Sequence, residues 1–235
     1  MRVLAMVIFC VILLLLPSVV LSDVIVHDLI VIKGENIMLK AETRGKFFRQ
    51  GGRMVEFFIN GKSVGKSLSG GDGFAFKQFT PLNIGFYKIT TRSDKEEDNG
   101  LLLSLKRGTK IVFIDVEGSL FEGLFSKKPR TGSQKVIKTI LGRFPVVFLQ
   151  TGFIGIKDIK IWLKENGFIA STVLPWNEGI IFDEINEKGL KIRAVIGSPS
   201  VIESAMDHKP EAFSFEEIED ADNVRDWEDI GRKLR

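Results

Sequence analysis

Residues 110–120 have the sequence KIVFIDVEGSL, in which a short apolar run rich in β-branched residues leads directly into two acidic residues. A run of this kind is typical of a buried strand in a parallel sheet. Parallel sheets bind ligands outside the carboxyl ends of their strands, which is where Asp115 and Glu117 fall. We therefore expect these two carboxylates, followed by a turn at Gly118, to form a chemical site at a strand end.

The chain from residue 109 onwards alternates predicted strands with predicted helices. Apolar runs predict strands at 110–114, 145–150 and 191–196, and helical spacing predicts helices at 132–141 and 156–166, with another around 184–188. Such alternation produces a parallel sheet with right-handed crossovers. We predict an α/β domain with a Rossmann-like sheet over residues 109–235.

Its segment 211–229 carries nine acidic residues against one arginine, and we expect a solvated acidic tail there.

Residues 23–108 have the pattern of an all-β domain. Short runs of strand-forming residues alternate with glycine and asparagine, and Asn60-Gly61 is a strong signal for a type I′ hairpin turn. Strands at this regular spacing are typical of a β-sandwich. We expect residues 92–100 to form a charged turn and residues 101–105 to close the sandwich. The chain is therefore predicted to have two domains.

Three pieces of this first domain resemble the bacterial immunoglobulin-like domains of exported proteins. They are the hairpin at 57–62, the turn Asp72-Gly73-Phe74, and the segment 81–90 with its Gly85-Phe86-Tyr87. The resemblance implies an immunoglobulin-like sandwich that holds, spaces or docks other parts. We find no catalytic constellation in its sequence.

The first 22 residues have the pattern of an export signal. An apolar run at 3–16 ends at Pro17, and residues 20–22 offer a cleavage site before Asp23. The alternative is an uncleaved anchor, because the apolar span 3–21 is long enough to cross a bilayer. Either way we expect an exported protein that is periplasmic, extracellular or membrane-anchored, with any membrane contact made through this segment.

The composition is that of a globular protein, with 44% hydrophobic and 27% charged residues. A net charge of +3, without a basic stripe, gives no reason to expect a nucleic-acid partner. The sole cysteine, Cys10, lies within the export segment. Disulfides and thiolate metal sites are therefore not expected in the exported chain. The sequence does not indicate an oligomeric state.

The second domain resembles the haloacid dehalogenase superfamily of phosphohydrolases. That family's first motif, Asp-x-Asp-Gly-Thr, corresponds to DVEGS at residues 115–119, and its second, a Ser or Thr that ends the next core strand, corresponds to Thr151. The segment 147–176, with Trp162-Leu163 and Asn166-Gly167-Phe168, looks like the lipin-like and phosphatidate phosphatase-type members. The resemblance extends from residue 110 to about residue 218.

The resemblance implies a role for each matching residue. Asp115 would attack phosphorus and form an aspartyl phosphate, while Glu117 would protonate the leaving oxygen and then activate water. Thr151 and the backbone N–H of Gly152 would hold the phosphate oxygens. Asp115 and Glu117 would also bind Mg²⁺, the implied cofactor. The substrate would be a phosphate ester, with phospholipid head groups among the candidates.

Two departures from the family pattern divide the functional hypotheses. The fourth motif, Gly-Asp-x-x-x-Asp, supplies acids for the metal, but residues 197–203 read GSPSVIE, with Glu203 as the nearby acid. The third motif supplies a lysine, which residues 182–184 lack. The first hypothesis is a Mg²⁺-dependent phosphatase, a phosphoric monoester hydrolase acting through Asp115. The second is a catalytically degenerate domain with a binding or structural role at the cell envelope.

Overall fold

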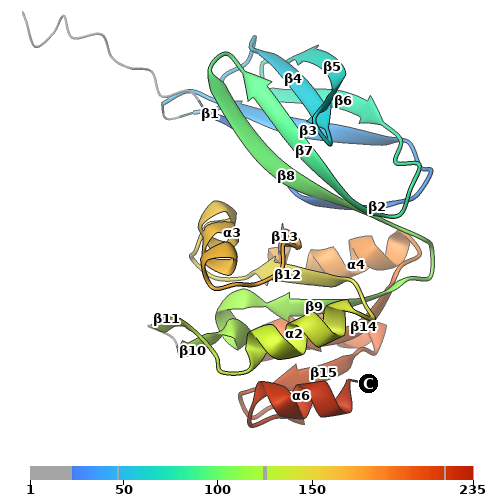
Figure 1. Ribbon diagram of the computed structural model, residues 1–235, viewed down its shortest axis with the longest axis vertical. Helices are drawn as coiled ribbons and strands as arrows, with labels where there is room; N and C mark the ends of the chain where they lie inside the picture. The colour runs from blue at the N-terminus through green and yellow to red at the C-terminus, as the bar shows by residue number, and fades with distance from the viewer. Residues whose placement is uncertain (1–22, 47, 124–125, 220, 235) are drawn as a thin grey trace, which may run out of the picture.

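A computed structural model describes residues 23–234, apart from residues 47, 124, 125 and 220. Figure 1 shows a β-sandwich stacked on an α/β domain. The segment predicted to direct export lies outside the described residues. Within the described part of the chain, no helix has the length and apolar character needed to cross a membrane.

The predicted β-sandwich is confirmed by two facing sheets. One sheet has the order β1-β3-β6 and the other the order β2-β8-β7-β4-β5. Asn60 and Gly61 both have positive φ, at 49° and 79°, as a type I′ turn requires. The strands are β1 (Asp23–Val26), β2 (Leu29–Ile32), β3 (Ile37–Arg44), β4 (Met54–Ile59), β5 (Lys62–Leu68), β6 (Phe74–Phe79), β7 (Gly85–Ser93) and β8 (Glu96–Leu105).

The charged stretch 92–100 differs from the expected turn, because most of it belongs to β7 and β8. The reversal is confined to the tight connection at Asp94, whose φ is 53°. Thr90 donates a hydrogen bond to Asn99 across the two strands at 2.7 Å, and Arg92 pairs with Glu97 at 2.6 Å. Cross-strand pairs of this kind stabilise strand pairing in a segment whose charged residues have low strand propensity.

The predicted parallel sheet of the second domain is also confirmed. All of its strands are parallel, in the order β13-β12-β9-β14-β15-β16. Its strands are β9 (Lys110–Asp115), β12 (Val146–Gln150), β13 (Thr172–Pro175), β14 (Lys191–Ile196), β15 (Glu211–Ser214) and β16 (Asp222–Asn223). Its α-helices are α2 (Ser133–Leu141), α3 (Ile156–Glu165), α4 (Ile180–Glu187), α5 (Pro199–Glu203) and α6 (Trp227–Lys233).

Both faces of this sheet are covered. Val112 and Ile114 of β9 pack against α2, α3 and α6, whereas Ile111 and Phe113 pack against α4, α5 and the sandwich strands β2 and β8. The chain runs from β9 to β12 and β13 on one side, and then returns to β14 and β15 on the other. The carboxyl end of β9 is therefore the topological switch point, the place where open α/β sheets bind ligands.

The acidic segment 211–229 differs from the expected solvated tail, because it contains β15, β16 and the start of α6. Trp227 is fully buried, and its indole N–H donates to the carbonyl oxygen of Ser119 at 3.2 Å. Phe213 is buried in the same hydrophobic cluster. The apolar residues between the acids thus make this segment part of the domain core.

A buried carboxylate joins the two domains. Asp28 accepts hydrogen bonds from the backbone N–H groups of Leu101 and Val173, both at 2.8 Å, and from the Lys160 ammonium at 2.6 Å. Its side chain is fully buried. The three hydrophobic clusters of the described residues lie within residues 24–234, so a protein that begins at Asp23 retains all of them.

We expect Asp28→Ala to lower the free energy of unfolding by about 3 kcal/mol, because two backbone N–H groups and an ammonium lose their buried acceptor. Urea unfolding measures this change. The control is Glu35→Ala, which removes the exposed Glu35–Arg107 ion pair and is expected to change stability by at most about 0.5 kcal/mol. Equal effects of the two substitutions would contradict the assignment.

Candidate active site

Strand β9 and the turn that follows it hold Asp115 at the switch point. Residues Val116–Leu120 form a single π-helical turn, and Asp115 caps it by accepting a hydrogen bond from the N–H of Gly118 at 3.0 Å. A side chain at Gly118 would overlap the Asp115 carboxylate, so glycine is required for this close approach. The hydroxyl of Ser119 donates back to the carbonyl oxygen of Asp115.

The Asp115 carboxylate is fully buried and receives four hydrogen bonds. Its Oδ1 accepts from Gly118 and from the Thr151 hydroxyl at 2.6 Å, and its Oδ2 accepts from the N–H and hydroxyl of Ser198 at 3.2 and 2.9 Å. The ends of β9, β12 and β14 supply these groups. The buried charge is thus stabilised by uncharged donors from three neighbouring segments.

Glu117 lies across the end of β12. Its Oε1 accepts a hydrogen bond from the N–H of Ile154 at 2.9 Å, and its Oε2 lies so close to Gly152 that any side chain there would overlap it. The Glu117 carboxylate therefore occupies the space that a side chain at residue 152 would need.

The structure brings the four predicted site residues, Asp115, Glu117, Thr151 and Gly152, around one cavity of about 460 Å³. Sequence reasoning missed several other lining residues. They come from the hairpin of β10 (Phe121–Gly123) and β11 (Ser126–Pro129), from the loops after β12 and β13, and from the segments after β14 and β15, and they include Ser126, Lys127, Phe153, Trp176, Ser198, Ser200 and Glu216. The rule that ligands lie at the carboxyl ends of parallel strands could have found Ser198 and Glu216.

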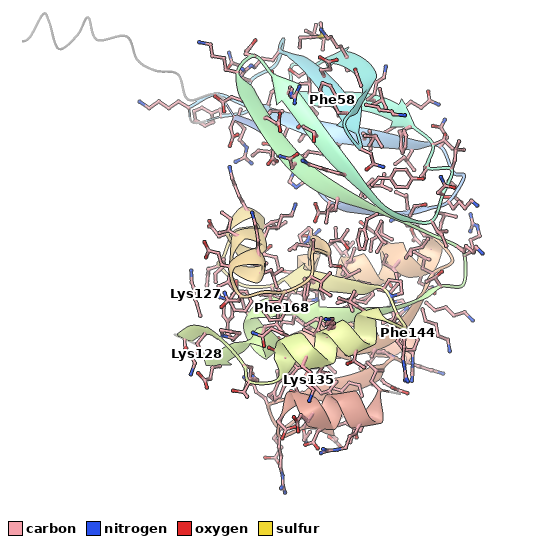
Figure 2. All side chains as sticks on the ribbon, in the orientation of Figure 1. Phe58, Lys127, Lys128, Lys135, Phe144 and Phe168 are labelled. Carbon is pink, nitrogen blue, oxygen red and sulfur yellow. The ribbon has the colours of Figure 1, made fainter. Side chains whose placement is uncertain are left out.

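The cavity carries more acidic than basic groups. Glu216 joins the two carboxylates of the first motif, while Lys127 is the basic residue among the described lining residues. Lys127 is exposed and lies on the β10–β11 hairpin at the edge of the domain (Figure 2). The cavity is therefore a poor environment for an uncompensated anion.

Neither the lysine Lys191 nor the acids Asp183 and Glu203 complete the site as a third or fourth motif would. Lys191 opens β14 and lies opposite Lys110, at the end of the sheet far from Asp115. Asp183 pairs with His208 at 3.1 Å, and neither Asp183 nor Glu203 lines the cavity.

The donor set does not fit a resident magnesium ion. Mg²⁺ requires near-octahedral oxygen ligands, so its ligating carboxylates must have free lone pairs. Each oxygen of Asp115 already accepts two hydrogen bonds, and Oε1 of Glu117 is held by Ile154. Across residues 23–234, as far as they are described, there is no group of three or more His, Cys, Asp or Glu residues that could hold a metal.

Comparison with known proteins finds similar folds among solved structures only at low sequence identity. No family model matches the chain, and no curated protein matches it. Similar solved structures include an "IG27 protein domain" (11% identity, 37% of this chain and 99% of that chain, TM-score 0.30). The fibronectin(III)-like modules of Clostridium thermocellum CbhA have 13% identity, cover 37% of this chain and 48% of that chain, and have a TM-score of 0.29. The D00-D0 domain of intimin has 16% identity, covers 36% of this chain and 46% of that chain, and has a TM-score of 0.29.

These neighbours are immunoglobulin- and fibronectin-like β-sandwich domains, the class to which the first domain was predicted to belong. Each covers little more than a third of the chain. The sandwich assignment rests on the two sheets described above, and the membership of the second domain in the haloacid dehalogenase superfamily stays a prediction.

We expect Asp115→Asn to lower the free energy of unfolding by about 2 kcal/mol, because the amide replaces an acceptor oxygen with a donor that faces other donors. Urea unfolding provides the measurement, and Glu117→Gln, at a partly exposed position, is the control with an expected loss below about 1 kcal/mol. A stabilised Asp115→Asn variant would instead indicate that the carboxylate is retained for function at a cost in stability.

Proposed function

We propose that the second domain is a haloacid dehalogenase-like domain that has lost phosphate-ester turnover, and that this exported protein acts by binding. The observation that carries the proposal is the contact between Ser198 and Asp115. In the resembling family, the residue after the glycine that ends this strand is a metal-binding acid. Here it is a serine, whose N–H and hydroxyl donate hydrogen bonds to the carboxylate oxygen that a metal would otherwise share.

The electrostatics of the cavity support the same conclusion. A phosphate about 4 Å from a carboxylate meets a repulsion of about 4 kcal/mol at an effective dielectric constant near 20. Asp115 and Glu117 would both oppose it, and each 1.36 kcal/mol of added barrier slows a reaction about tenfold. The exposed Lys127 is a weak counterbalance. A phosphate ester would therefore react slower by orders of magnitude than in a compensated site.

The phosphohydrolase is the second candidate, and the placement of Asp115 favours it. The residue lies at the switch point of the sheet, with Thr151 beside it and Glu117 two residues further along the chain. In that mechanism a carboxylate oxygen of Asp115 displaces the alcohol from phosphorus, and Glu117 gives the leaving oxygen its proton. Water activated by Glu117 then releases phosphate and restores Asp115.

Phosphate release separates the two candidates. The protein beginning at Asp23 is incubated with Mg²⁺ and a panel of phosphomonoesters that includes phosphatidate, beside the Asp115→Asn variant. We expect no release above that of the variant on any substrate. Turnover by the parent protein that the variant lacks would overturn the proposal and establish the phosphohydrolase.

A gain of metal binding tests the role assigned to Ser198. We expect Ser198→Asp to lower the Tm without divalent cations, because a second carboxylate then faces Asp115. Mg²⁺ at ten times its Kd should raise the Tm of this variant by about 3–6 °C and leave the parent unchanged.

Ser200→Asp is the matched control, because Ser200 lines the same cavity but is exposed and makes no recorded contact with Asp115. Its Tm should not respond to Mg²⁺. A Ser198→Asp variant that is equally insensitive to Mg²⁺ would count against the correspondence between Ser198 and a metal-binding acid.

A further inference from the structure

A second cavity, of about 480 Å³, lies between the two domains and away from Asp115. Leu101 of β8 lines it from the sandwich, and Leu163 of α3 with the loop after that helix lines it from the α/β domain. Phe168, Ile169 and Val173 complete an apolar wall. Cavities of this size at domain interfaces, lined mainly by apolar side chains, are the usual form of a small-molecule site.

The polar groups of this cavity are all cationic or neutral. Lys88, Lys160 and Lys164 line it, and no carboxylate belongs to its described lining residues. Lys160 is paired with Asp28. Lys88 and Lys164 are exposed, and no ion pair to either is recorded among the described residues. An apolar wall with two available ammonium groups is complementary to a molecule that has an apolar body and an anionic head.

The cavity is preformed by the contacts that hold the two domains together. The Asp28 carboxylate binds the backbone N–H groups of Leu101 and Val173 and the ammonium of Lys160, and all three of these residues line the cavity. Its sandwich wall and its α/β wall are therefore fixed relative to each other. A preorganised site spends little binding free energy on ordering its own residues.

Phe168 gives the cavity a rigid wall beside α3 (Figure 2). Its ring stacks on Trp162 with centroids 5.5 Å apart and meets Phe148 edge-on at 6.2 Å. The residue is buried, and its backbone N–H donates to the carbonyl oxygen of Leu163. An apolar chain would therefore rest against a surface whose conformation the core already determines.

We propose that this interdomain cavity binds a single-chain amphiphile with an anionic head group, such as a medium-chain carboxylate. The apolar chain lies against Leu101, Leu163 and Phe168, and the head group pairs with Lys88 and Lys164. The assignment is independent of the Asp115 site and of whether that site turns over a phosphate ester.

Chain length and head-group charge together test the assignment. Calorimetric titration of the protein beginning at Asp23 compares hexanoate, octanoate, decanoate and dodecanoate, each below its micellar concentration. We expect one binding site, with Kd falling about fourfold per added CH₂ until the cavity is full. Decanol should bind at least fivefold more weakly than decanoate. Dodecyl phosphate, run beside dodecanoate, shows which anionic head the two lysines prefer.

Variants locate the binding site within the molecule. The double variant Lys88→Gln/Lys164→Gln should weaken decanoate at least fivefold and leave decanol unchanged. Ala170→Trp, at an exposed lining position, should weaken both ligands more than tenfold by filling the cavity. Lys138→Gln, on the exposed side of α2, is the matched control and should change neither Kd.

The parent and the variants should share the same urea midpoint, so that altered affinity reports on the cavity. Absence of saturable binding by the parent would overturn the proposal. So would a Kd that is independent of chain length, or an affinity that Ala170→Trp leaves unchanged while the protein remains folded.

Discussion

The arrangement of the two domains depends on the burial of one carboxylate. Asp28 lies in the connection between β1 and β2, which belong to different sheets of the sandwich, and it accepts hydrogen bonds from β8, α3 and β13. Removing a carboxylate from water is costly unless its lone pairs are satisfied, so the bonds form as a set or not at all. Apolar residues of β2 and β8 also pack against the parallel sheet and add buried area to the same interface.

Asp115 follows the same physical rule at the other end of the sheet. Four donors surround its carboxylate, as three surround that of Asp28. An aspartate that must attack phosphorus needs an oxygen with lone pairs directed at the substrate. An aspartate that organises a loop needs the opposite, and the donors from Gly118, Thr151 and Ser198 meet that need. Under the proposed function, Asp115 stands where an attacking carboxylate would stand, but its neighbours use its lone pairs to organise the loop.

The features that could be predicted from the sequence are those determined by local pattern. Apolar periodicity and backbone preference act over a few residues. They account for the strand that ends at Asp115, the Asn60-Gly61 turn and helix α3. The motif match also placed Asp115, Glu117, Thr151 and Gly152 around one cavity. What the Asp115 carboxylate can do chemically depends on Ser198, which lies 83 residues further along the chain. No local sequence pattern specifies that the Ser198 hydroxyl points at Asp115.

The differences from the sequence-based expectations also arise from long-range contacts. Residues 92–100 have the charges of a loop, yet pairing between β7 and β8 extends through them because each strand offers the other a complete set of partners. Segment 211–229 is rich in acids, but Trp227 and Phe213 bury enough apolar surface to draw it into the sheet and its helical cover. Composition describes the exposed side of such segments, and the few buried residues decide where the backbone goes.

The bond between Trp227 and Ser119 has a consequence for the order in which the second domain can form. Strand β9 is the first strand of that domain to be synthesised, and α6, which carries Trp227, is its last helix. The turn after Asp115 therefore lacks this packing partner until the chain has been synthesised through α6, because Trp227 follows Ser119 by 108 residues. Bringing two residues 108 positions apart into contact costs loop-closure entropy, so we expect the turn after Asp115 to gain its full packing only once α6 has docked. A chain that ends before α6 would keep the sandwich and lose the support beneath the Asp115 turn.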